Sequence, residues 1–66
     1  MTPQAFSAAL ADLGWSQRQL AAALGVTHTV VVRMAQGTRR IEPDLARWLA
    51  RAQQWLRANP VPRKQP

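Results

Sequence analysis

Three glycines divide the first 37 residues into short segments, and their positions constrain the fold more than any other feature of the chain. Gly14, Gly25 and Gly37 each follow a stretch whose apolar residues recur at helical spacing. A glycine in that place ends a helix, because it adopts a left-handed conformation at little cost. The pattern predicts short helices joined by tight turns.

Residues typical of helix N-termini stand at positions that match these predicted helix ends. Thr2 followed by Pro3 is an N-cap with proline at the first helical position. Ser16 has Gln19 three residues later, which is the spacing of a capping box. Pro43 is a further first-turn proline. Together, the starts and stops predict an all-α chain with helices near residues 3–13, 17–24, 28–36 and 43–58.

The three consecutive valines at residues 30–32 test this interpretation, because by propensity alone they favour a strand. Thr27 is an N-cap candidate just before them, and the chain has no second strand-like run with which they could pair. The helix penalty of valine is well under about 1 kcal/mol per residue, which tertiary packing can override. We therefore expect residues 28–36 to be helical.

The composition argues against an enzyme and against a bound cofactor. There is no cysteine and only one histidine, so no metal site or cofactor is expected. The carboxylates are Asp12, Glu42 and Asp44, and no serine or histidine stands in a triad-like relation to them. A glycine-rich phosphate loop is also absent from the sequence.

The charge balance points to a polyanionic partner. Nine basic residues, eight of them arginine, stand against three acidic ones, which gives a net charge of +6. Such a field favours nucleic acid or an acidic membrane surface. No apolar run approaches the ~20 residues of a transmembrane span, and the N-terminus lacks the pattern of a signal peptide. A cytoplasmic, nucleoid-associated protein is expected.

The segment SQRQLAAALGVT, residues 16–27, carries a family resemblance. It resembles the helix-turn-helix of the Xre/Cro-like (lambda-repressor-like) repressors, whose pattern is commonly S-Q-x-x-L-A-x-x-L-G-V-[ST]. Ala21 is small where the next helix presses on it. The positions expected to face inward are Leu20, Leu24, Val26, Val31 and Met34. The resemblance covers roughly residues 4–56. It implies a compact four-helix lambda-repressor-like DNA-binding domain over residues 1–58, with the helix-turn-helix at 17–36.

The resemblance also implies which residues contact double-stranded DNA. Helix 28–36 would enter the major groove with one face outward. On that face, Arg33 can bind a guanine edge through two parallel hydrogen bonds, and Val32 can pack on a thymine methyl. The expected base-reading residues are His28, Thr29, Val32 and Arg33. The expected DNA-backbone residues are Gln17, Arg18, Thr27, Gln36, Arg39 and Arg40.

The last helix carries more apolar side chains than a domain of this size can cover. Trp48 is expected in the core, whereas Trp55 and Leu56 are expected to form the interface of a two-fold homodimer. Residues 59–66 hold three prolines and two cations, and they are expected to form a short disordered tail.

The expected function is that of a sequence-specific transcriptional regulator. The resemblance and the short chain favour a phage or mobile-element repressor that binds a near-palindromic operator as a dimer. One alternative is an antitoxin-like or anti-CRISPR-associated autorepressor with a protein partner. Another is a basic membrane-surface protein, although the cap and turn signals argue for a packed globule instead.

Overall fold

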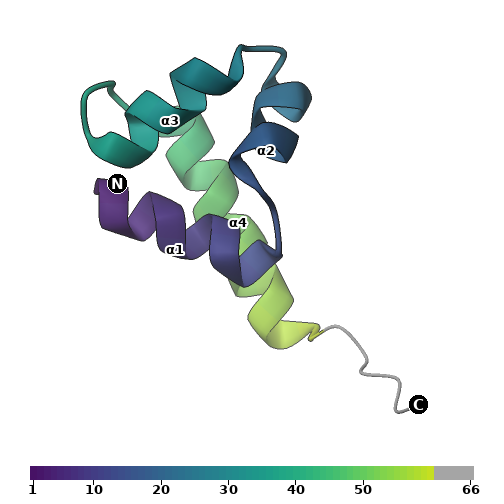
Figure 1. Cartoon of the computed structure of the whole chain (residues 1–66). Helices are drawn as coiled ribbons and strands as arrows, with labels where there is room; N and C mark the ends of the chain where they lie inside the picture. The colour runs from purple at the N-terminus through teal and green to yellow at the C-terminus, as the bar shows by residue number, and fades with distance from the viewer. Residues whose placement is uncertain (61–66) are drawn as a thin grey trace.

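The computed structural model describes residues 1–60, and these residues contain helices but no strand. The helices are α1 (Pro3–Leu13), α2 (Gln17–Leu24), α3 (His28–Gln36) and α4 (Pro43–Ala58) (Figure 1). These bounds confirm the predicted all-α, four-helix fold. Asn59 and Pro60 follow α4 without helical structure. The rest of the predicted tail, residues 61–66, lies outside the described residues.

Side-chain caps begin the first two helices as their sequences predict. The Thr2 hydroxyl accepts the backbone N–H of Ala5 at 3.0 Å. At α2, the Ser16 hydroxyl accepts the Gln19 N–H at 3.1 Å, and the Gln19 side chain accepts the Ser16 N–H at 2.7 Å. This reciprocal pair satisfies two backbone donors that the helix itself leaves unpaired.

The valine run is helical, because packing outweighs its strand propensity. Val31 is completely buried and Val30 is half-buried, so the inner face of α3 contributes to the core. Burying one such side chain stabilises the fold by roughly 1.5–3 kcal/mol, several times the helix penalty of valine.

A single apolar core joins the helices. α1 packs against both α3 and α4, and α2 packs against α3. Side chains from all four helices meet in this core, and none of the buried side chains in the described part is polar or charged. The buried residues are Phe6, Ala9, Leu10, Leu20, Ala21, Val31, Met34 and Leu49.

Three predictions of burial for large apolar side chains are wrong. Trp48 is 50% exposed, Leu24 is 40% exposed and Val26 is 38% exposed, although all three were expected to face the core. The reason is that α2 and α4 do not pack closely on each other. Between them lies a groove of about 670 Å³, which we call the α2–α4 groove. Its apolar lining includes Leu20, Leu24, Val26, Val30, Leu45 and Trp48.

Candidate nucleic-acid interface

α2 and α3 are joined by the three-residue turn at residues 25–27 (Figure 1). Gly25 takes a left-handed conformation there, with φ +72°. The Val26 N–H then donates to the Ala21 carbonyl at 3.0 Å, which closes the end of α2 and redirects the chain. Two short helices linked by such a turn form a helix-turn-helix unit.

One face of α3 is turned away from the core. His28, Thr29 and Arg33 are exposed, and so is Gln36 at the end of the helix. Val32 lies on the same face and is half-buried. The structure therefore places the sequence-predicted base-reading residues together, on a helix whose opposite face is held by Val31 and Met34.

The start of α2 offers backbone donors beside a cation. The capping box uses the N–H of Gln19, and within residues 1–60 the N–H groups of Gln17 and Arg18 make no hydrogen bond. Gln17 is half-buried, whereas Arg18 is exposed. Unpaired N–H groups and the positive end of the helix dipole favour an anion such as a phosphate.

Thr27 occupies the N-cap position of α3 but does not cap it. Its side chain makes no cap hydrogen bond, and the residue is exposed. The hydroxyl is thus left without a cap hydrogen bond at the point where the turn meets α3. This leaves the start of α3 held by packing and by backbone contacts such as Val30 N–H to Thr27 carbonyl, at 3.2 Å.

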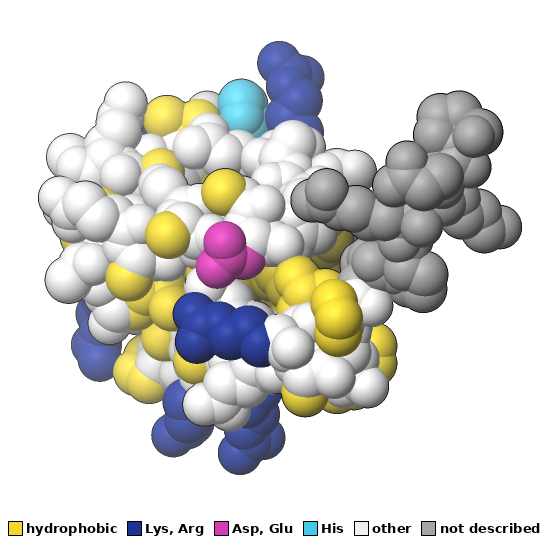
Figure 2. Space-filling view, turned by 90° about the horizontal axis from the view of Figure 1, so that it is seen from below, with side chains coloured by type: hydrophobic (Ala, Val, Ile, Leu, Met, Phe, Trp, Pro, Cys, Tyr) yellow, Lys and Arg dark blue, Asp and Glu magenta, His cyan; other side chains and the backbone are white. Residues whose placement is uncertain are grey.

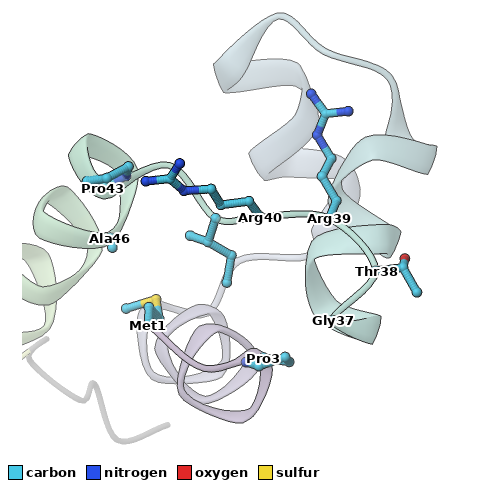
Figure 3. A pocket seen from close by; sticks show the side chains of 9 residues that line it. Met1, Pro3, Gly37, Thr38, Arg39, Arg40, Pro43 and Ala46 are labelled. Carbon is cyan, nitrogen blue, oxygen red and sulfur yellow. The ribbon is translucent and has the colours of Figure 1, made fainter.

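The two arginines of the loop before α4 diverge. Arg40 extends toward Pro43 across a depression that Met1 and Pro3 also line (Figure 3). Arg39 turns away from Arg40 and also lines the α2–α4 groove. Both are exposed, but the structure does not bring their guanidinium groups together.

The charge distribution separates the helix-turn-helix from the acidic residues. Residues 13–41 contain four arginines and no acidic residue. Within residues 1–60, one ion pair forms, and it joins Arg47 to Asp44 on α4. In Figure 2, dark blue arginine side chains project from the edges of the face, and one lies beside an acidic side chain near its centre. The arginines near α3 are thus not neutralised by neighbouring carboxylates.

Sequence reasoning missed the open apolar groove. Inside it, the rings of Trp15 and Trp48 have centroids 5.6 Å apart and are tilted by 38°. No local pattern in the sequence indicates this groove, because it exists only where α2 and α4 fail to pack closely on each other. In the part of the chain that the structure describes, no helix is long and apolar enough to cross a membrane.

A helix-turn-helix with an exposed polar face on its second helix, in an arginine-rich segment, defines a class of DNA-binding regulators. Comparison with protein families agrees, because a model described as helix-turn-helix matches residues 7–52. The chain belongs to this family, that of the Xre/lambda-repressor-like helix-turn-helix domains. Comparison with curated proteins and with solved structures gave no match.

Proposed function

We propose that the protein is a sequence-specific transcriptional repressor that inserts α3 into the major groove of double-stranded DNA. One observation carries this proposal: the exposed face of α3 presents Arg33, His28 and Thr29 side by side, in a segment free of acidic residues. A major groove about 12 Å wide admits an α-helix, and it displays a distinct pattern of donors and acceptors for each base pair.

Each outward side chain of α3 has a matching chemistry on DNA. Arg33 donates two parallel hydrogen bonds to guanine O6 and N7, and Val32 packs on the methyl group of thymine. His28 and Thr29, in the first turn, reach base edges at the deepest point of insertion. Gln36 lies two turns further on, at the end of the helix, and contacts the DNA backbone.

The remaining contacts set the register on the duplex. Gln17 and the N-terminus of α2 bind one phosphate, with Arg18 beside them and the Thr27 hydroxyl across the turn. Arg39 and Arg40 neutralise further phosphates. These contacts are independent of base sequence, and they make the affinity depend on salt.

The repressor acts as a homodimer on a near-palindromic operator in the cytoplasm, with two α3 helices about one DNA turn, ~34 Å, apart. The exposed Trp55 supports an interface on α4, since it is the most exposed large apolar side chain of residues 1–60. A phage or mobile-element origin stays a prediction from the sequence.

Selection of bound duplexes from a random pool tests the proposal. We expect enrichment of one motif with two inverted half-sites whose centres are separated by about 10 base pairs. Selection with Arg33→Ala should lose the preference at one position of each half-site while keeping the others. A pool that stays random after repeated rounds, at low salt, would contradict sequence-specific binding.

A further inference from the structure

The α2–α4 groove borders the helix-turn-helix and is open along one side. Its wall includes Val30 and Met34 of α3, so the groove touches the helix that is proposed to read DNA. At its rim, the large apolar side chains Leu24, Val26 and Trp48 are exposed. Contiguous apolar surface that is left open in this way marks an interaction site.

The open side of the groove decides what kind of occupant fits. Sites for small molecules bury about 70–90% of the surface of the ligand, whereas a small ligand here would stay in contact with water along the rim that Leu24 and Trp48 form. An amphipathic helix instead lays its apolar face into such a groove and keeps its polar face in water. The groove between α2 and α4 therefore fits a third helix better than it fits a small molecule.

The charges that line the groove cancel each other. Asp44 lines it but is paired with Arg47, so these two residues contribute no net charge. Glu42 and Arg39 also line it, and within residues 1–60 neither of them forms an ion pair. One carboxylate and one guanidinium thus remain available to an occupant.

Arg51 makes the whole surface positive. It lies three residues after Trp48, which places both side chains on one face of α4, and it is exposed and forms no ion pair within the described residues. The third acidic residue of the chain, Asp12, does not offset it. Asp12 accepts a hydrogen bond from Gln53 at 2.8 Å, and Gln53 lies about 200° round the helix from Arg51.

We propose that the α2–α4 groove is the docking site for an acidic amphipathic helix of a partner protein. Apolar side chains at positions i, i+3, i+4 and i+7 of that helix fill the groove, and carboxylates on its flank pair with Arg39 and Arg51. A basic helix would meet both arginines with only Glu42 to compensate. Trp55 and the half-buried Leu56 do not line the groove, so this surface is separate from the α4 interface proposed above.

Docking in the groove opposes DNA binding. Arg39 lines the groove and is also one of the proposed phosphate contacts, so a partner carboxylate and a DNA phosphate compete for its guanidinium. Its backbone is tied to α3, because the N–H groups of Thr38 and Arg39 donate to the Arg33 carbonyl at 3.0 and 3.3 Å. By linkage, the partner and DNA weaken the binding of each other by the same factor. This consequence rests on the proposed function, whereas the docking itself does not.

Three synthetic peptides of about 20 residues test the docking. The first has leucine at i, i+3, i+4 and i+7 and glutamate on the opposite face, the second has lysine in place of each glutamate, and the third is a scrambled version of the first. Titration calorimetry with the full chain should show that the first binds about tenfold or more tightly than the other two. Equal affinities of the first and the scrambled peptide, binding of the lysine peptide at least as tight, or no binding of the first peptide would each overturn the proposal.

A pair of tryptophan substitutions locates the site. Trp48→Ala should weaken binding of the patterned acidic peptide about tenfold, because it removes an aromatic wall of the groove. Trp55→Ala is the matched control, since Trp55 is exposed on the same helix but outside the groove. Leu24→Ala is a second probe on α2, in case the loss of the contact between Trp48 and Trp15 unfolds the chain. If Leu24→Ala and Trp48→Ala bind the peptide as tightly as Trp55→Ala does, the groove is not the site.

Competition with DNA tests the antagonism. The patterned acidic peptide at saturation should weaken DNA binding about tenfold more than the scrambled peptide does, and Arg39→Ala should remove most of that excess. Arg40→Ala is the control, because Arg40 extends toward Pro43 and away from Arg39 (Figure 3). An equal excess in the two variants, or a DNA affinity that the bound peptide leaves unchanged, would overturn the antagonism.

The docking site and the proposed function fail separately. A chain that binds the patterned peptide through Trp48, yet never selects a DNA sequence, would contradict the repressor and leave the docking site intact. A chain that selects a DNA motif but binds the patterned and scrambled peptides equally would overturn the docking site alone.

Discussion

Gly37, at the end of α3, lies directly against the ring of Pro3 at the start of α1. A Cβ atom on Gly37 would stand 3.0 Å from Pro3 Cγ, closer than normal contact, and the backbone there has φ +82°. This contact joins the end of α3 to the N-terminus of the chain.

Gly37→Ala should therefore destabilise the domain more than Gly25→Ala. Both substitutions strain a left-handed backbone, which costs roughly 1–2 kcal/mol, but a Cβ on Gly25 meets no atom within 4 Å. Urea denaturation of both variants measures the difference. Adding Pro3→Ala to Gly37→Ala should recover part of the excess loss, and strictly additive effects of the two substitutions would show that the contact has no energetic role.

Arg33→Ala should reduce the affinity for the selected operator by about 1–3 kcal/mol and leave binding to random DNA nearly unchanged. The reason is that bidentate guanine contacts discriminate between bases. Fluorescence anisotropy with both duplexes measures the two affinities. Arg57→Ala is the control, because Arg57 is an exposed arginine at the far end of α4. Equal losses of affinity on the two duplexes would show that Arg33 contacts phosphates and not bases.

Arg39→Ala and Arg40→Ala should each weaken binding to all sequences alike. Each lost phosphate contact should reduce the slope of log affinity against log salt by about 1. Because the two side chains diverge, their effects should add. The slope is measured between 50 and 200 mM salt in about five steps for each variant. A variant with the wild-type slope would show that its arginine does not contact a phosphate.

Thr27→Ala should weaken DNA binding at little cost to stability, because the Thr27 hydroxyl makes no cap hydrogen bond. Ser16→Ala should instead destabilise the domain. It should lower the free energy of unfolding by ~1 kcal/mol, because it breaks a capping box. Thermal unfolding and anisotropy are measured on both variants. Thr27→Ser should restore DNA affinity, and a failure to do so would place the contact on the methyl group.

Val31→Ala and Val32→Ala should separate the two roles of the valine run. Val31 is fully buried, so its truncation should destabilise the fold by about 1–3 kcal/mol. Val32 is half-buried on the outer face of α3, so its truncation should leave most of the stability and reduce the preference for one thymine. A uracil-substituted operator, which lacks that methyl group, should bind wild type and Val32→Ala equally. A large discrimination between thymine and uracil by Val32→Ala would contradict the contact.

The helices and their ends were predictable because their signals are local. Ser16 and Gln19 cap each other across three residues, and Gly25 ends α2 through its own backbone conformation. The outward face of α3 followed from helical geometry once the valine run was assigned to a helix. The contacts of this face with DNA stay predictions, since the structure shows only where the side chains lie.

By itself, the sequence determined the four helices, the turn between α2 and α3, and the basic character of the segment around them, because each depends on residues a few positions apart. Only the tertiary structure decided that Leu24 and Trp48 are exposed, and that Arg39 and Arg40 point to different hollows. Whether a side chain is covered depends on which helices touch each other. Because α2 and α4 are far apart in the sequence, no local pattern records that they do not pack closely. The open groove between them is the consequence of packing, which is collective.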